Sequence, residues 1–289
     1  MIERLVVAGV GLIGGSLALA ARRSGACART VGWGRDAERL AAAVRAGVID
    51  EGHTDPAAAL AGAGLIVLAV PLGACRAVFE ALRPHRPADA VVTDVGSVKT
   101  SVIEDARAVF GAVPPWFVPG HPIAGDARSG FGAARADLFH GRRVVLTPLP
   151  ETDAGALARV EALWTAVGAE VERCTAEEHD RVLADTSHLP HLLAYALVEH
   201  LLRRHGRERA FRFAAGGFRD FSRIAASDPT MWRDICLANR PALRAALGSY
   251  RALLAELDAA LDAADGAALY EWFARAKAAR ERFCDRGER

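Results

Sequence analysis

Two hydrophobic patterns follow one another along the 289-residue chain. In the first half, short apolar runs alternate with stretches in which apolar residues recur every three or four positions, as on one face of a helix. The runs expected to form strands are residues 5–8, 30–33, 65–70, 90–94, 116–118, 143–147 and 170–172. Such alternation of strands and helices is typical of a parallel sheet with helices on both faces. We therefore predict an α/β domain over residues 1–174.

The pattern changes after Cys174. Strand-like runs give way to long amphipathic helical patterns over residues 177–204, 241–263 and 267–283. Helices rich in Ala and Leu commonly pack into a bundle through their apolar faces. We therefore predict a second, all-helical domain over residues 175–289.

A glycine fingerprint follows the first predicted strand. Gly9, Gly11 and Gly14 have the spacing G-x-G-x-x-G and open the first predicted helix. The first glycine permits a tight turn, the second lets the backbone approach a pyrophosphate, and the third lets helix and strand pack closely. The helix start at Leu12 and Ile13 offers free N–H groups and a positive dipole end to phosphates. The N-terminal domain is therefore predicted to be a Rossmann-type dinucleotide-binding domain.

The end of the second predicted strand bears on the choice of cofactor. An NAD site usually has an acidic residue there for the ribose hydroxyls, but the alignment places Gly34 at that position and Arg35 after it. A guanidinium in place of a carboxylate favours a 2′-phosphate, so we expect NADP rather than NAD. Asp36 keeps NAD open if the turn differs by one or two residues. The other expected cofactor contacts are Val70, Pro71 and Gly96.

Four further segments resemble the prephenate/arogenate dehydrogenase family in residues, order and spacing. They are residues 94–99 (DVGSVK), 120–125 (GHPIAG), 187–191 (SHLPH) and 216–225 (GGFRDFSRIA), the last followed by 228–232 (DPTMW). The resemblance extends from residue 4 to about residue 240. It implies an oxidoreductase of tyrosine biosynthesis that oxidatively decarboxylates prephenate or arogenate with NAD(P)⁺, giving 4-hydroxyphenylpyruvate or tyrosine. It also implies a homodimer formed through the helical domain.

The reaction removes a hydride from an alcohol carbon, so the hydroxyl proton needs a base. A neutral histidine suits this role because its ordinary pKa is about 6.5. We expect His121 to be the base, on a loop after the strand at 116–118, and the family resemblance assigns it that role. The resemblance also makes Ser97 the hydroxyl that orients this histidine and the substrate, whereas a Ser after Gly is, by its position alone, more often a helix N-cap. The two roles are compatible. Lys99 is expected to be a helix-start charge or a cofactor neighbour.

Two further histidines flank Pro190. The resemblance places His188 in the substrate pocket, while His191 is open between a core role and a supporting one. Their i, i+3 spacing is compatible with metal binding, but no third ligand recurs at zinc-like spacing. We therefore expect no metal.

Prephenate carries two carboxylates, so its pocket needs cations. Arg219 and Arg223 are four residues apart and share a face if the segment is helical. A solvated arginine face is the alternative explanation of the spacing, but the resemblance assigns substrate contacts to this segment, and to Arg223 in particular. Asp220 is expected to orient one of the arginines. Trp232 is expected either to wall the pocket or to pack in the core.

One departure from the family pattern bears on the substrate. Many members that prefer prephenate have an acid where this chain has Ala127, while an acid stands one residue earlier at Asp126. A related dehydrogenase that acts on an amino-substituted prephenate in a secondary pathway stays open. So does a non-catalytic dinucleotide-binding sensor. A β-hydroxy acid dehydrogenase would need a lysine in the helical domain, where only Lys277 stands, close to the C-terminus.

Composition narrows the remaining possibilities. The net charge is +1, which gives no basis for nucleic-acid or anionic-membrane binding, so the expected partner is a small-molecule substrate. The five cysteines are scattered without a C-x-x-C pair, which favours a reducing compartment. There is neither a signal-peptide pattern nor an uninterrupted apolar stretch of about 18 residues. We therefore expect a cytoplasmic protein.

Overall fold

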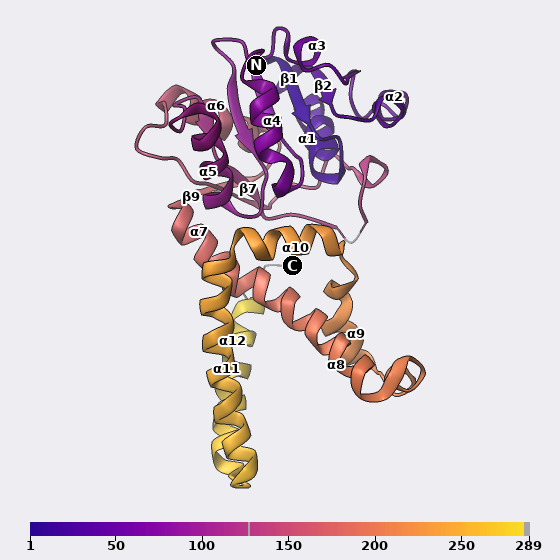
Figure 1. Cartoon of the computed structure of the whole chain (residues 1–289), viewed down its shortest axis with the longest axis vertical. Helices are drawn as coiled ribbons and strands as arrows, with labels where there is room; N and C mark the ends of the chain where they lie inside the picture. The colour runs from indigo at the N-terminus through magenta and orange to yellow at the C-terminus, as the bar shows by residue number, and fades with distance from the viewer. Residues whose placement is uncertain (127, 286–289) are drawn as a thin grey trace. The chain divides into compact units, whose positions relative to one another are not determined.

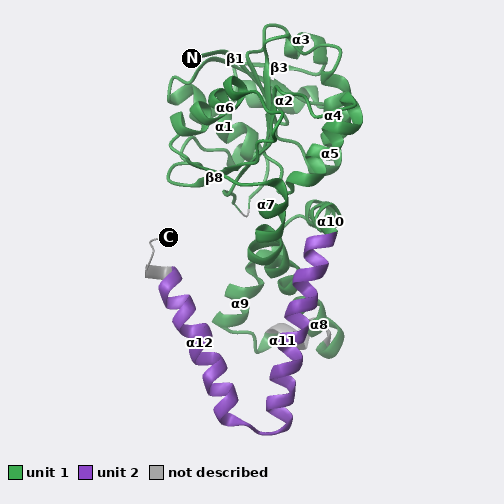
Figure 2. Cartoon of the chain, turned by 90° about the vertical axis from the view of Figure 1, so that its left-hand side faces the viewer, with its two compact units in different colours: residues 1–240 green, residues 241–289 purple. Residues whose placement is uncertain are grey.

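The computed structural model describes residues 1–126 and 128–285, leaving aside the side chains of residues 206–211, 284 and 285. Its chain divides into two compact units, residues 1–240 and residues 241–289, shown in two colours in Figure 2. The first unit contains the sheets and the four α-helices that follow them. The second contains the C-terminal helices.

The first unit is built on a six-stranded parallel sheet (Figure 1). Its strands are β1 (Ile2–Ala8), β2 (Cys27–Trp33), β3 (Glu51–His53), β4 (Leu65–Leu68), β5 (Val91–Asp94) and β6 (Phe117–Val118). They lie in the order β3-β2-β1-β4-β5-β6. The direction of the strand order reverses between β1 and β4, and open α/β sheets bind ligands at the carboxyl ends of the strands beside such a point. The predicted fold class is confirmed.

Six helices cover the two faces of the sheet, and the first five of them connect its strands. They are α1 (Leu12–Arg23), α2 (Ala37–Arg45), α3 (Pro56–Leu60), α4 (Cys75–Leu82), α5 (Lys99–Phe110) and α6 (Ala154–Ala166). Side chains of β1 alternate between two buried clusters: Leu5 and Val7 join the cluster that contains Trp164 of α6, and Val6 joins the cluster that contains Phe79 of α4. Burial on both faces explains why these strands are almost wholly apolar.

The end of the α/β region departs from the prediction of one sheet. Strands β7 (Gly120–Pro122), β8 (Arg143–Leu146) and β9 (Glu170–Arg173) form a separate three-stranded sheet, in which β7 runs antiparallel to β8. The chain leaves the main sheet at Pro119, which has no N–H to continue the ladder of β6. His121, expected on a loop, therefore lies in a short strand.

The helical part of the first unit also differs from the prediction. It consists of α7 (Ala176–Leu183), the π turn η3 (Ala184–His188), α8 (Leu189–Arg212), α9 (Gly216–Ser222), the 3₁₀ turn η4 (Arg223–Ala226) and α10 (Pro229–Ala238). The single helix expected over 177–204 is thus interrupted by a π turn that ends at His188. Pro190 follows two residues after His188 and cannot donate to the helical ladder. Single π turns within helices are frequent at functional sites.

The second unit is a helical hairpin (Figure 2). It is formed by α11 (Arg240–Asp262) and α12 (Gly266–Asp285). Between them Ala264 has a φ of 49°, and the Asp265 carboxylate caps α12 by accepting a hydrogen bond from the N–H of Ala268 at 3.0 Å. Large apolar side chains stay exposed on these helices: Leu253, Leu254, Leu261, Tyr270, Phe273 and Phe283. Among the described residues, no helix is long and apolar enough to cross a membrane.

Candidate active site

The glycine turn after β1 has the geometry that a pyrophosphate site needs. Gly9 has a φ of +95°, and a Cβ there would lie 2.4 Å from the carbonyl oxygen of Ala69. A Cβ on Gly14 would lie 2.3 Å from the carbonyl oxygen of Gly9, so only glycine lets α1 pack this closely. A Cβ on Gly11, by contrast, would meet nothing within 4 Å. Leu12 then begins α1, whose start carries no side-chain cap. The free N–H groups and the open space beside Gly11 fit a dinucleotide pyrophosphate.

The loop after β2 leaves Arg35 exposed and uses Asp36 for structure. The Asp36 carboxylate caps α2 by accepting a hydrogen bond from the N–H of Arg39 at 3.0 Å. The backbone N–H of Gly34 donates to the carbonyl oxygen of His53 at 3.3 Å. The Asp36 carboxylate, which was the possible contact for the ribose hydroxyls of NAD, is therefore partly used to cap α2.

Other expected cofactor residues lie at the carboxyl ends of neighbouring strands. Val70 and Pro71 follow β4, and Gly96 follows β5 in a buried turn. The N–H of Gly96 donates to the carboxylate of Asp94 at 2.8 Å. The residues named for the cofactor thus gather at one edge of the main sheet.

A fully buried ion pair lies behind this edge. The ammonium group of Lys99 contacts the carboxylate of Asp94, and it donates to the carbonyl oxygen of Gly120 at 2.6 Å. Asp94 also accepts from the N–H of Gly120 at 3.1 Å. The pair therefore ties the end of β5 to the residue before His121. Lys99 is a helix-start charge, as one of the two expectations had it, and a buried one.

His121 is joined to a histidine of the helical region. Its Nδ1 lies 2.8 Å from Nε2 of His179, which is 58 residues further along the chain. Burial, followed by the electrostatic influence of His179 and Lys99, holds the pKa of His121 well below its ordinary value of 6.5. The imidazole is therefore neutral at physiological pH, as a general base must be.

His179 is held in turn by Asp180. Nδ1 of His179 lies 2.7 Å from one carboxylate oxygen of Asp180. The N–H of Lys99 donates to that oxygen at 2.7 Å, and the N–H of Thr100 donates to the other at 2.9 Å. Burial raises the pKa of the Asp180 carboxyl, but these donors outweigh it and the pKa lies below its ordinary value. Asp180 is therefore a carboxylate that caps α5.

Asp180 thus provides the helix cap that one of the two hypotheses had assigned to Ser97. Helix α5 begins at Lys99, and its N-cap residue Val98 has no side-chain cap bond. In the described part of the chain, no hydrogen bond joins the half-buried Ser97 to His121 or to the helix start. Ser97 lies on the same turn as Gly96, close in sequence to the buried ion pair, but it is not a helix cap.

His188 is almost wholly buried, at 1% exposure, at the end of the π turn. Its Nδ1 lies 3.0 Å from Nδ2 of Asn239, which also donates to the carbonyl oxygen of Asp180 at 2.7 Å. Its Nε2 is buried and has no hydrogen-bond partner among the residues that the structure describes. Burial lowers the pKa of His188 to about 4, so this ring is also neutral. A buried donor without a partner is the feature expected of a ligand contact.

Trp232 and His191 form the wall beside His188. The rings of His191 and Trp232 are stacked with centroids 3.7 Å apart, and Trp232 lies edge-on to His188 at 6.2 Å. Nδ1 of His191 contacts the carbonyl oxygen of Ser187 at 2.9 Å. Trp232 also packs on Val98 in a small buried cluster. Trp232 is therefore packed in a core cluster, and its role as a wall of the substrate pocket stays a prediction.

The arginine segment is less closely tied to this cluster. Arg219 lies in α9 and Arg223 begins η4, and both side chains are exposed in the single chain. The charge of Arg223 contributes to the lowered pKa of His191, after burial, so this guanidinium lies near the aromatic wall. In the described residues no ion pair joins Asp220 to either arginine. Arg223 is thus the arginine that the structure brings toward the site.

Three contributors were not foreseen from the sequence: His179, Asp180 and Asn239. The adjacent His–Asp pair in the middle of α7 is a weak signal, and nothing local marks Asn239. The structure describes part of the segment after His121 in which the acidic residue is displaced by one position relative to the family pattern. Asp126 pairs with Arg135 at 2.8 Å, while Ala127 lies outside the described residues.

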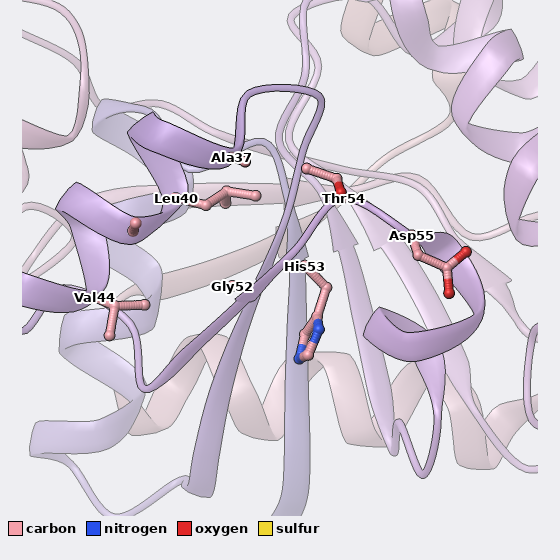
Figure 3. Close-up of a pocket in the computed structure, with 8 residues that line it drawn as sticks. Ala37, Leu40, Val44, Gly52, His53, Thr54 and Asp55 are labelled. Atoms are coloured by element: carbon pink, nitrogen blue, oxygen red, sulfur yellow. The ribbon is translucent and has the colours of Figure 1, made fainter.

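One hollow of the surface lies away from these residues. It measures about 270 Å³ between α2 and the segment after β3, lined by Leu40, Val44, His53, Thr54 and Asp55 among others (Figure 3). None of the expected site residues lines it. Within the described ranges, no group of three His, Cys, Asp or Glu side chains has the arrangement of a metal site.

Two family models match the chain. Residues 17–173 match the prephenate dehydrogenase nucleotide-binding domain, and residues 175–275 match the prephenate dehydrogenase dimerization domain. A cyclohexadienyl dehydrogenase of Zymomonas mobilis is 37% identical over 96% of this chain and 95% of its own length.

Solved structures agree with these matches. The prephenate dehydrogenase of Aquifex aeolicus, in complex with hydroxyphenyl propionate and NAD⁺, is 36% identical with a TM-score of 0.93, covering 98% of this chain and 99% of the other. The arogenate dehydrogenase of Synechocystis is 31% identical with a TM-score of 0.82, covering 97% and 100%.

Proposed function

Because the chain belongs to the prephenate and arogenate dehydrogenase family, whose members are NAD(P)-dependent oxidoreductases of tyrosine biosynthesis, we propose that it oxidatively decarboxylates prephenate or arogenate with His121 as the base. The observation that carries the proposal is the neutral, partly buried imidazole of His121 beside the carboxyl edge of a dinucleotide-binding sheet. The resemblance seen in the sequence and the activity class expected from it are confirmed.

Each part of the proposed mechanism has a residue to perform it. The turn of Gly9, Gly11 and Gly14 holds the cofactor pyrophosphate, and bound NAD(P)⁺ supplies the hydride acceptor. His121 accepts the proton of the substrate hydroxyl as the alcohol carbon is oxidised. The resulting ketone is a vinylogous β-keto acid, so the ring carboxylate leaves as carbon dioxide and the ring becomes aromatic. His188 and Trp232 line the substrate side of the site.

The side chain of the substrate needs a cation, and we propose that Arg223 supplies it. Arg223→Ala is expected to raise KM about 10- to 100-fold, since hydrogen bonds to charged groups contribute about 1.5–3 kcal/mol, while kcat changes less. Arg219→Ala is expected to change KM less than about threefold, the range of surface substitutions. Steady-state kinetics of both variants, with the exposed Arg204→Ala as control, measure the difference. An unchanged KM in Arg223→Ala would remove this residue from the substrate site.

Cofactor preference is a separate proposal. We propose that NADP is preferred, because Arg35 is exposed at the end of β2 and the Asp36 carboxylate caps α2. The relative from Aquifex aeolicus was solved with NAD⁺, so dual use is the competing outcome. Arg35→Ala is expected to lower kcat/KM for NADP⁺ by about tenfold, the effect of about 1.4 kcal/mol, and to leave that for NAD⁺ unchanged. Equal losses with both cofactors would contradict the proposal.

We also propose that the protein is a homodimer formed through the helical region, with the functional division of the chain near residue 174. The matching model is described as a dimerization domain, and α11 and α12 expose large apolar side chains. Light scattering of the purified protein at micromolar concentration is expected to give about twice the mass of one chain; the mass of one chain would contradict it.

A panel of substrates tests the activity. Purified protein is given prephenate, arogenate and amino-substituted prephenate with each cofactor, and both the reduced nicotinamide and the released carbon dioxide are followed. Turnover of prephenate or arogenate is expected. Turnover of the amino-substituted compound alone would support the secondary-pathway enzyme instead, and turnover of none, with cofactor still bound, would support a sensor.

A further inference from the structure

Asp180 lies at the junction of two hydrogen-bond chains that end at the imidazoles of His121 and His188. Its carboxylate contacts His179, which contacts His121. Its backbone carbonyl oxygen accepts from Asn239, which contacts His188. One residue is therefore connected to both rings, once through its side chain and once through its main chain.

The proton positions along the first chain follow from the chemistry of the groups. The N–H groups of Lys99 and Thr100 donate to the two carboxylate oxygens of Asp180, which identifies an ionised acceptor. Nδ1 of His179 must then be the donor to that carboxylate. A neutral imidazole that donates from Nδ1 has its lone pair on Nε2.

The next link fixes His121. Since Nε2 of His179 is an acceptor, Nδ1 of His121 must donate to it across the 2.8 Å contact. The ring of His121 is neutral, so its Nε2 is the unprotonated nitrogen. That nitrogen is the one left to take a proton.

The hydrogen-bond chain through Asn239 gives His188 the opposite tautomer. The Nδ2 group of Asn239 donates to the carbonyl oxygen of Asp180, which fixes the amide orientation, and an amide nitrogen is only a donor. Nδ1 of His188, at 3.0 Å, must therefore accept from it. The proton of His188 then lies on Nε2, which is buried and without a partner in the described structure.

We propose that Asp180 is a positioning residue that sets complementary tautomers: through His179 it leaves Nε2 of His121 as a proton acceptor, and through Asn239 it leaves Nε2–H of His188 as a donor to the substrate. The inference rests on the proposed function for the identity of the bound molecule. A substrate hydroxyl can give its proton to the first ring, while a substrate oxygen can accept a hydrogen bond from the second. Neither ring has to exchange its proton before the reaction.

The tautomers can be read directly in the unaltered protein. The full chain is labelled with ¹⁵N-histidine, and long-range proton–nitrogen correlation spectra are recorded at pH 7.5 without substrate. The variants His121→Asn, His179→Gln and His188→Asn assign the signals. We expect a proton on Nδ1 of His121 and of His179, and on Nε2 of His188. A proton on Nε2 of His121, or equal populations of its two tautomers, would overturn the proposal.

A pair of variants tests whether the hydrogen-bond chain from Asp180 through His179 to His121 affects turnover. Asp180 caps α5, so its own substitution would perturb folding, and His179 is the better position. His179→Leu removes both hydrogen bonds and is expected to lower kcat about 10- to 100-fold, as the loss of an orienting partner does, with little change in KM. His179→Gln keeps an acceptor and a donor on one side chain and is expected to recover most of kcat. Equal losses of kcat in the two variants would contradict the proposal.

The two experiments separate this inference from the proposed function. The spectra are independent of any substrate, whereas the activity is measured by the substrate panel. Active enzyme with the wrong tautomers would sink the inference alone. Expected tautomers in a protein that turns over neither prephenate nor arogenate would sink the proposed function alone.

Discussion

The two halves of the candidate site are built in different ways. The cofactor turn is made of backbone: three glycines within six residues, whose missing side chains leave room for the turn, for the helix packing and for a phosphate. The base is made of side chains that the fold brings together, across 58 residues from His121 to His179 and 81 residues from Lys99 to Asp180. Local sequence therefore specifies the first half, and only the tertiary structure specifies the second.

The largest expected effect separates chemistry from cofactor binding. His121→Asn removes the base and is expected to lower kcat about 10²- to 10⁴-fold, the usual contribution of general base catalysis. Because the glycine turn is untouched, the Kd for the cofactor is expected to stay within a factor of two or so of the original, a change below about 0.5 kcal/mol. Stopped-flow turnover and fluorescence titration measure the two quantities. The exposed His85→Asn is the matched control, and near-normal turnover in His121→Asn would refute the assignment of the base.

The next effect concerns stability in acid. His121, His179 and His188 have lowered pKa values in the native state, mainly through burial, whereas in the unfolded chain they protonate near pH 6.5. Below pH 6.5 the unfolded state therefore binds more protons, and the free energy of unfolding falls as the pH falls. For His188, with its pKa of about 4, the loss between pH 6.5 and 4 amounts to about 3 kcal/mol.

Urea unfolding at pH 7, 6 and 5 measures this slope. His188→Asn, whose amide oxygen can still accept from Asn239, is expected to reduce the slope by up to about 1.4 kcal/mol per pH unit. His85→Asn again serves as the exposed control. A slope that His188→Asn leaves unchanged would show that this imidazole is not held neutral by the fold.

The smallest expected effect tests the glycine turn, which is the half of the site made of backbone. Gly14→Ala places a Cβ 2.3 Å from a backbone oxygen and is expected to destabilise the fold by about 1–3 kcal/mol. Gly11→Ala meets nothing within 4 Å at a φ of −107°, so it is expected to leave stability within about 0.5 kcal/mol. It is expected to weaken cofactor binding all the same, because the methyl group occupies the phosphate space. Thermal unfolding and cofactor titration compare the pair, and unchanged cofactor affinity in Gly11→Ala would place the pyrophosphate elsewhere.

The same contrast explains what sequence reasoning could reach. The parallel sheet, the glycine turn, and the motifs that contain His121 and His188 all carry local patterns, and the fold class and family predicted from them are confirmed. The separate sheet of β7, β8 and β9 was missed because a short apolar run does not indicate which strand it pairs with. The π turn that ends at His188 was missed because its hydrogen bonds span only one residue more than those of an α-helix.

The residues that orient the bases were beyond local patterns altogether. Asp180 caps a helix that begins 81 residues earlier, and Asn239 contacts a histidine 51 residues earlier. Long-range hydrogen bonds of this kind leave no spacing in the sequence. The sequence predicted that arginines contact the substrate, but it did not predict their positions. Arg219 and Arg223 are both exposed in the single chain.

A crystal structure with NAD(P)⁺ and hydroxyphenyl propionate tests the central claim most directly. The account predicts that Nε2 of His121 lies within about 3.2 Å of the phenol oxygen, on the same side as the nicotinamide ring. A phenol oxygen bound away from this nitrogen, with the ring of His121 still turned toward His179, would contradict the account.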